Sequence, residues 1–94
     1  MQFEWDHKKN GINLRKHGVN FEEAKTVFKN PLSLSFDDEV HSSPEEHREI
    51  IIGHSVMNRV LLVYFTERSG SIRLISARPA NRQELNDYES NLFL

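Results

Sequence analysis

The sequence predicts an α+β domain in which a short N-terminal strand and a two-helix hairpin pack on an antiparallel β-sheet meander, followed by a C-terminal helix. Two observations carry this prediction. Apolar residues recur at helical spacing up to about residue 30 and then alternate with polar residues. Helical and strand segments are also segregated along the chain, which is typical of α+β folds. A length of 94 residues fits one domain, residues 1–94.

A short strand and a first helix open the chain. Phe3 and Trp5 alternate with polar neighbours, which is the strand pattern. Asp6 is a favourable N-cap for the helix. We expect the helix to end at about His17, because Gly18 can adopt the left-handed backbone conformation that ends a helix without steric cost. The apolar side chains of this helix, which we expect to face the sheet, are Ile12 and Leu14.

A second helix completes the αα-hairpin. Asn20 caps it, with Glu23 three residues later as in a capping box. Asn30-Pro31 ends it. Its apolar stripe consists of Phe21, Ala24, Val27 and Phe28.

Four strands and a last helix are predicted to follow. A half-buried strand covers residues 32–37, and an exposed acidic loop covers Asp38–Glu46. The next strand is Arg48–His54. The strand Arg59–Thr66 is almost entirely apolar and is therefore expected to be central. Beyond the turn at Ser69-Gly70, the last strand is Ile72–Arg78, and Asn81 caps a final helix that holds Glu84, Leu85 and Tyr88.

Charge is distributed unevenly, although the formal net charge is only −2. Residues 1–20 are basic, residues 37–49 and 84–94 are acidic, and residues 50–83 carry five arginines against one glutamate. Arginine has a planar fork that matches phosphate, but arginines that flank apolar strands also serve solubility. The absence of cysteine excludes disulfides and thiolate zinc sites. No segment resembles a membrane span or a signal peptide, so a cytoplasmic protein is expected.

Few motifs point to cofactor chemistry. There is no phosphate-binding glycine loop and no zinc-protease helix, so neither a cofactor nor a metal is expected. The spacing of His41, His47 and His54 matches no compact metal site and favours solvated histidines. His17 is open to two interpretations. It stabilises the helix dipole, or it acts in proton transfer within a basic patch.

Glu67, Arg73, Arg78 and Tyr64 are the remaining candidates. Glu67 is expected beside Arg68 and Arg73 at the hairpin, either as a surface ion pair or as a general base. Strict alternation places Arg73 and Arg78 on opposite faces of the sheet. The hydroxyl of Tyr64 needs a partner if it is buried. A metal-free ribonuclease needs only a base, an acid and cations near the phosphate, and these residue types can provide them.

Two long segments resemble the BrnT toxins, a family of RelE-like ribonucleases. They are FEWDHKKNGINLRKHGVNFEEA near the start and TERSGSIRLISARPANRQELNDYE near the end. The residues that match the family pattern in order are Trp5-Asp6, Asn13, Lys16-His17-Gly18-Val19, Phe21, Glu23-Ala24, Phe28, Tyr64, Thr66-Glu67-Arg68, Ile75-Ser76-Ala77-Arg78, Ala80 and Tyr88-Glu89. The resemblance extends from Phe3 to about Glu89.

The resemblance implies a RelE-like fold and a ribonuclease that stops translation. It also implies a BrnA-like antitoxin of the ribbon-helix-helix class, which neutralises the toxin and links it to DNA only indirectly. On the matching positions we expect Lys16 to hold the RNA backbone, and His17 or Glu67 to transfer protons. Arg73 and Arg78 are assigned to phosphate, with Tyr64 as a weaker candidate.

Two other functions stay open at the level of the sequence. A catalytically inactive RelE-like module that binds RNA or protein agrees better with the slightly acidic net charge, because free RNA-binding proteins usually carry a larger basic excess. A generic oligomerising domain is the other alternative, and the uneven distribution of charge argues against it.

Overall fold

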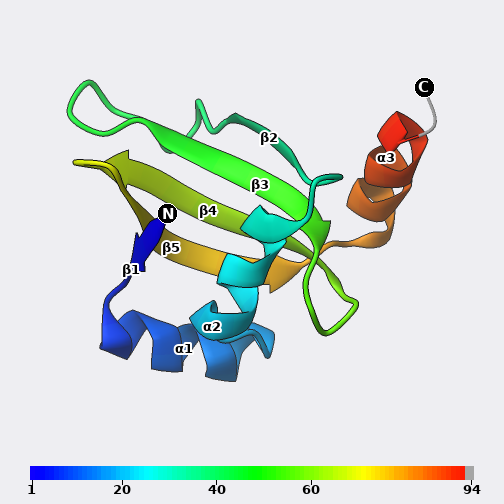
Figure 1. The fold of residues 1–94 in the computed structure, drawn as a ribbon, viewed down its shortest axis with the longest axis horizontal. Coiled ribbons are helices and arrows are strands. Elements are labelled where there is room, and N and C mark those ends of the chain that lie inside the picture. Colours follow the sequence, from blue (N-terminus) through cyan, green and yellow to red (C-terminus); the bar gives the residue numbers. More distant parts are fainter. Residues whose placement is uncertain (93–94) are drawn as a thin grey trace.

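A five-stranded sheet with the order β1-β5-β4-β3-β2 organises the computed structural model, which describes residues 1–92 (Figure 1). The elements in chain order are β1 (Gln2–Glu4), α1 (His7–His17), α2 (Phe21–Ala24), the 3₁₀ helix η1 (Lys25–Lys29), β2 (Leu34–Asp37), β3 (Arg48–His54), β4 (Val60–Arg68), β5 (Ser71–Pro79) and α3 (Arg82–Leu92). The predicted α+β class is confirmed. No helix within these residues is long and apolar enough to cross a membrane.

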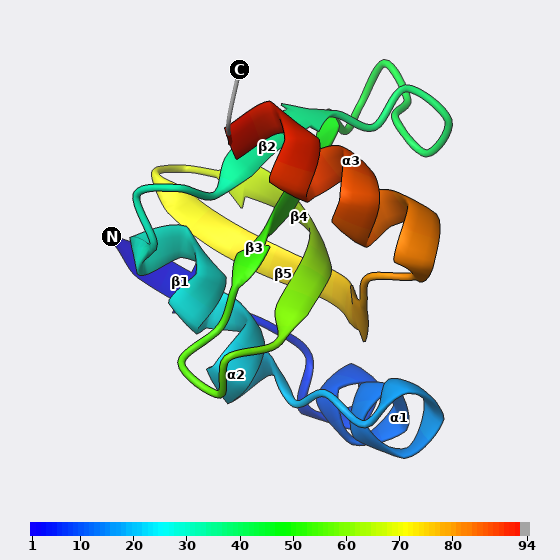
Figure 2. The same ribbon diagram turned by 90° about the vertical axis from the view of Figure 1, so that its right-hand side faces the viewer.

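The sheet is antiparallel from β2 to β5, and β1 adds a parallel pairing to β5 that the sequence did not predict. The two faces carry different helices. The stripe of α2 and η1 packs with Val63, Phe65 and Leu74 on one face. Tyr88 of α3 packs with Ile52 and other residues on the opposite face, so α3 lies across the sheet from the helical hairpin (Figure 2).

The helix ends follow their local signals. The Asp6 carboxylate accepts hydrogen bonds from the backbone N–H groups of Lys8 and Lys9, and these bonds lower the pKa of Asp6. Gly18 takes the left-handed conformation with a φ of 71°. The Asn20 side chain accepts a hydrogen bond from the Glu23 N–H at 2.8 Å. The predicted caps of both helices are therefore confirmed.

The second helix is shorter than predicted. Regular α-helix ends at Ala24, and a tighter 3₁₀ segment continues the turn. The Thr26 hydroxyl donates to the Glu23 carbonyl at 2.6 Å, and the β-branched pair Thr26 and Val27 disfavours further α-helix. The apolar stripe survives the change, because Phe21, Ala24 and Val27 are all fully buried.

Two sequence-based expectations about burial are wrong. All four residues of β2 are exposed, because β2 is an edge strand rather than a half-buried one. Ile12 and Leu14 of α1 are 51% and 48% exposed instead of facing the sheet. The face of α1 that is buried against the sheet carries a polar residue, Asn13.

Asn13 forms four hydrogen bonds, three of which join α1 to β5. Its side-chain amide donates to the carbonyls of Val19 and Ala77, both at 2.8 Å. Its oxygen accepts from the Ala77 N–H at 3.1 Å and from the Ser76 hydroxyl at 3.3 Å. The side chain thus satisfies both backbone groups of Ala77 and places the C-terminal end of α1 beside β5.

A β-bulge in β5 changes the predicted positions of two arginines. Tyr64 pairs with Ser76, but Phe65 pairs with Leu74, so Ile75 is left as an extra residue. The extra residue reverses the alternation beyond it. Arg73, opposite Thr66, and Arg78, opposite Leu62, therefore share the face that carries Tyr64, and the expectation of opposite faces is wrong.

Replacing Asn13 with alanine should lower the free energy of unfolding by about 3 kcal/mol, because buried backbone groups of Val19 and Ala77 would lose their partners. Urea denaturation measures the change. Asn91→Ala is the matched control. Asn91 is exposed and, within residues 1–92, its side chain donates only to the Asp87 carbonyl, so its loss should cost less than about 0.5 kcal/mol. An equal effect of the two variants would contradict the role given to Asn13.

Candidate functional site

Two hollows meet at the bulged part of β5. One, the α1 hollow, has a volume of about 150 Å³ and is lined by Lys9, Ile12, Asn13, Lys16, His17, Ile75 and Ser76. The other, the loop hollow, has a volume of about 170 Å³ and is lined by His41, Arg48, Tyr64, Ile75 and Ser76. Because both are lined by Ile75 and Ser76, the two hollows adjoin at β5, with α1 at one end and the 38–47 loop at the other, and we refer to them together as the depression.

The α1 hollow contains the first two predicted site residues. Lys16 and His17 lie in the last turn of α1, which Asn13 holds against β5. Lys16 is exposed, and His17 is half-buried. Within residues 1–92, neither Lys9 nor Lys16 forms an ion pair, so both ammonium groups are free to meet an anion.

The loop hollow contains Tyr64 together with His41 and Arg48, which the sequence did not single out for function. Residues Asp38–Glu46 were expected to form an exposed acidic loop, but the Asp38 side chain is only 5% exposed. Asp38 lies 2.8 Å from Nδ1 of His41, and the His41 ring meets the Tyr64 ring edge-on, with 6.2 Å between centroids. The only available signal was the i, i+3 spacing of an aspartate and a histidine beside a turn.

Arg78 lies at the margin of this depression, bound by a carboxylate from α3. Its Nη1 and Nη2 donate to the two oxygens of Glu84 at 2.7 and 2.8 Å, and Nη2 lies 3.4 Å from the Tyr64 hydroxyl. The Arg78 guanidinium holds the pKa of Glu84 below its usual value, and Glu84 raises the pKa of Arg78. Glu84 also forms a reciprocal capping box with Asn81, which confirms that cap.

The remaining predicted residues lie outside the two hollows. Arg73 shares the face of Tyr64, but its Nη1 lies 3.8 Å from a carboxylate oxygen of Glu4. Glu67 is exposed and, by its register, is on the opposite face of the sheet from Tyr64. The expected pairing of Glu67 with Arg68 is wrong, because Arg68 binds Glu46 at 2.9 Å. The structure therefore brings Lys16, His17 and Tyr64 to one depression, with Arg78 at its margin, and separates Glu67 from them.

Carboxylates offset most of the arginine charge in residues 50–83. Four of the five arginines lie within 4.0 Å of a carboxylate. The pairs are Arg59–Glu23, Arg68–Glu46, Arg73–Glu4 and Arg78–Glu84. The most buried of the four carboxylates is Glu23, whose pKa Arg59 lowers. The free positive charge beside the depression comes instead from the lysines of α1.

One group of side chains has the geometry for a metal ion. Single ligand atoms of Asp37, His47 and Glu49 lie within 4.8 Å of one another. Asp37 and His47 are exposed, and Nε2 of His47 lies 3.1 Å from a carboxylate oxygen of Asp37. Asp37 and Glu49 form a cross-strand pair on the face opposite Tyr64, so this group is not part of the depression.

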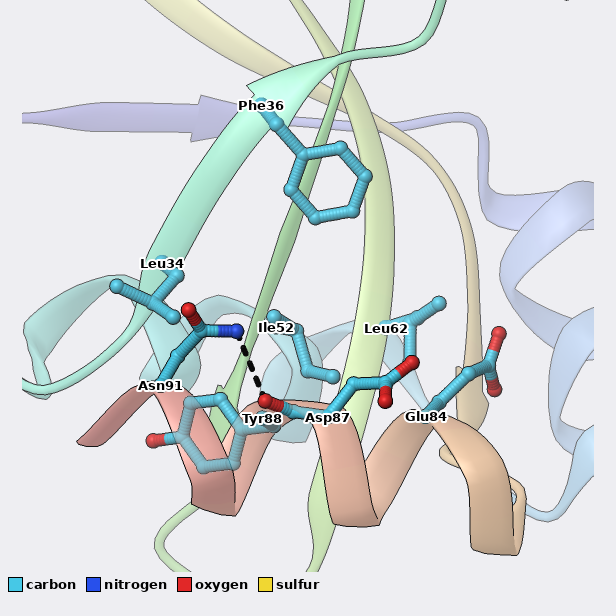
Figure 3. Close-up of a pocket in the computed structure, with 8 residues that line it drawn as sticks. All are labelled: Leu34, Phe36, Ile52, Leu62, Glu84, Asp87, Tyr88 and Asn91. Carbon is cyan, nitrogen blue, oxygen red and sulfur yellow. Dashed lines mark hydrogen bonds between the residues drawn. The ribbon is translucent and has the colours of Figure 1, made fainter. Parts of the chain in front are cut away.

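A third hollow, of about 260 Å³, lies between α3 and the edge strand β2 (Figure 3). Its apolar wall includes Leu34, Phe36 and Ile52, and the polar side chains at α3 include Glu84 and Asp87. No cation lines it. A polyanionic ligand is therefore better matched by the depression beside α1.

Comparisons with known proteins give a consistent result. Residues 5–84 match a family model described as the ribonuclease toxin BrnT of type II toxin-antitoxin systems. The 1.1 Å crystal structure of the Brucella abortus ribonuclease toxin BrnT superposes with a TM-score of 0.67. The two sequences are 22% identical, and the match covers 87% of this chain and 99% of that one. No protein in the curated set matches.

These findings define the class of protein: a ribonuclease toxin of a type II toxin-antitoxin system. The chain belongs to the BrnT family, because the family model covers most of its length. The resemblance inferred from the sequence is confirmed, and the Brucella structure shows the same fold. As a type II toxin, the protein has an antitoxin as its partner.

Replacing Glu84 with glutamine should weaken the dependence of the free energy of unfolding on pH in the acid range. The pKa of Glu84 is lower in the folded than in the unfolded protein. The ion pair with Arg78 therefore stabilises the fold fully at pH values above about 4.5, the ordinary pKa of a glutamate. That contribution is lost as the pH falls through the folded-state pKa. The variant should therefore be less stable than the wild type at pH 7, and the difference should shrink below pH ~4.5. Denaturation at a series of pH values measures it.

Glu89→Gln is the matched control for this prediction. Glu89 is an exposed carboxylate on the same helix and forms no ion pair within the described part of the chain. Its replacement should leave the pH dependence of the free energy of unfolding the same as in the wild type. A pH-independent difference between wild type and Glu84→Gln would show that the pair does not carry the dependence.

Proposed function

We propose that this BrnT-family protein cleaves RNA without a metal ion and uses the depression between α1 and the 38–47 loop to do so. The supporting observation is that Ile75 and Ser76 line both hollows, so that Lys16 and His17 lie along the same depression as Tyr64. An imidazole, a phenol and free ammonium groups are sufficient for phosphodiester transfer through the 2′-hydroxyl of RNA.

Each residue has a role that its position allows. Lys16, which has no carboxylate partner among residues 1–92, holds the RNA backbone, and His17 transfers a proton at the reacting phosphodiester. Arg73 and Arg78 supply positive charge on the same sheet face, reduced by their carboxylate partners. Tyr64 donates a hydrogen bond toward the phosphate. Glu67 is left out of the reaction because its register puts it on the other face.

The biological consequence we infer is arrest of translation in the cytoplasm, where the RNA substrates are. We also infer that the antitoxin is a BrnA-like protein of the ribbon-helix-helix class, which would couple the toxin to DNA without direct contact between toxin and DNA. The support for both inferences is the match to the BrnT family model. A RelE-like protein that binds RNA or its partner without cleaving RNA is the alternative.

Induced expression in a bacterial host tests the function directly. The wild type should stop incorporation of labelled amino acid and cleave cellular RNA, whereas the triple variant K16A/H17A/R78A should do neither while remaining folded. The purified wild type should cleave RNA equally well in excess EDTA. If wild type and triple variant are both folded and harmless, the binding module is the correct function.

Removing a lysine of the α1 hollow should weaken RNA binding in a salt-dependent way. Lys16→Ala should reduce the slope of log K against log salt by about 0.7, the effect of one phosphate contact on a single strand. Lys29→Ala, on η1 and outside both hollows, is the charge-matched control and should leave the slope unchanged. Equal slopes for the two variants would exclude α1 as the RNA-binding surface.

A further inference from the structure

Asp38 and His41 form a carboxylate–imidazole pair at the loop hollow. The carboxylate is almost completely buried, with 5% of the Asp38 side chain exposed, while 58% of the His41 side chain remains accessible. Oδ2 of Asp38 lies 2.8 Å from Nδ1 of His41, and the backbone N–H of His41 donates to Oδ1 of Asp38 at 3.4 Å. A buried aspartate that contacts Nδ1 favours the tautomer with a proton on Nδ1 and a free electron pair on Nε2.

The loop around this pair is fixed to the sheet. The Asp38 N–H donates to the Arg48 carbonyl at 2.9 Å. The Ser42 hydroxyl donates to the Asp38 carbonyl at 2.7 Å and accepts from the Arg48 N–H at 2.8 Å. These bonds hold the backbone on both sides of His41 against β3. The imidazole therefore has a defined position although its ring is accessible.

The imidazole faces groups that suit a phosphodiester. Tyr64 from β4 meets it edge-on, and Arg48 from β3 lines the same hollow. Only Nε of Arg48 is bound, to Glu46 at 2.7 Å, which leaves its terminal nitrogens without a hydrogen bond inside residues 1–92. Within the same residues Nε2 of His41 has no hydrogen-bond partner either. His41 thus lines the loop hollow with its Nε2 unbonded, and Ser76 lines both that hollow and the α1 hollow, which contains His17.

We propose that His41 is the general base of RNA cleavage, that Asp38 is its positioning residue, and that His17 across Ser76 is the general acid. This inference rests on the proposed function. Nε2 of His41 takes the proton of the 2′-hydroxyl, and the 2′-oxygen forms a bond to the adjacent phosphorus. The bond from phosphorus to the 5′-oxygen breaks, and that oxygen takes a proton from the His17 imidazolium. The products are a 2′,3′-cyclic phosphate and a free 5′-hydroxyl.

Single-turnover cleavage of a defined single-stranded RNA by the purified protein tests the base. His41→Gln should lower the cleavage rate at least about 100-fold, the usual contribution of a general base, with RNA affinity within about threefold of the wild type. His47→Gln is the matched control. It is a histidine of the same segment that contacts Asp37 on the other face of the sheet, and its replacement should leave the rate unchanged.

Asp38→Asn tests the positioning role. It should lower kcat about tenfold or more with little change in KM, and the ring ¹⁵N shifts of His41 should show loss of the Nδ1–H tautomer. If Asp38 only stabilised the loop, its replacement would leave the tautomer of His41 unchanged. Should the Asp38 variant fail to fold, the same ¹⁵N shifts in the wild type give the tautomer directly, and protonation of Nε2 instead of Nδ1 would overturn the proposal.

The possible outcomes distinguish failure of the assignment of His41 from failure of the proposed function. Cleavage by wild type and by His41→Gln at equal rates would overturn the assignment of His41 and leave the proposed function intact. A wild type that binds RNA but does not cleave it would overturn the proposed function and the base together. A product with a 3′-hydroxyl and a 5′-phosphate would exclude attack by the 2′-oxygen and thus the chemistry assigned to His41.

Discussion

The attachment of α1 to β5 through Asn13 is the constraint on which the candidate site depends. A single buried amide satisfies the N–H and the carbonyl of Ala77 and also reaches the carbonyl of Val19 beyond the helix. Apolar packing does not replace this contact, because Ile12 and Leu14 are each about half exposed. The free lysines and His17 reach the bulged part of β5 only because this polar attachment holds the last turns of α1 there.

Pairing of charges decides which cations are available at the surface. Arginines of the sheet form ion pairs with carboxylates, and Arg78 and Glu84 form a bidentate pair. Such pairs keep the arginines ordered, but they cancel much of the charge that a phosphate would feel. Lysines on α1 lack these partners within residues 1–92, so a chain with a slightly negative net charge still presents a local basic surface.

Much of the fold could be predicted because its signals are local. The caps at Asp6, Gly18 and Asn20 are short-range hydrogen-bonding and steric effects, and the structure has all three. The apolar composition of β4 identified it as a central strand for the same kind of reason. Burial of α1 and β2 was predicted less well, because it depends on which elements lie beside them, and a single sequence does not state that.

The sequence by itself determined the α+β class and the family. It also singled out six residues of interest, which are Lys16, His17, Tyr64, Glu67, Arg73 and Arg78. Tertiary structure decided how these residues combine. One extra residue in β5 reverses side-chain alternation, so Arg73 and Arg78 share a face that periodicity assigned to opposite sides. The Asp38 carboxylate is buried in a polar loop, so Asp38 and His41 form an ordered pair, whereas the sequence predicted that both are solvated. The bulge arises from the pairing of β4 with β5, and the ordered loop arises from its hydrogen bonds to β3, and neither leaves a trace in local periodicity.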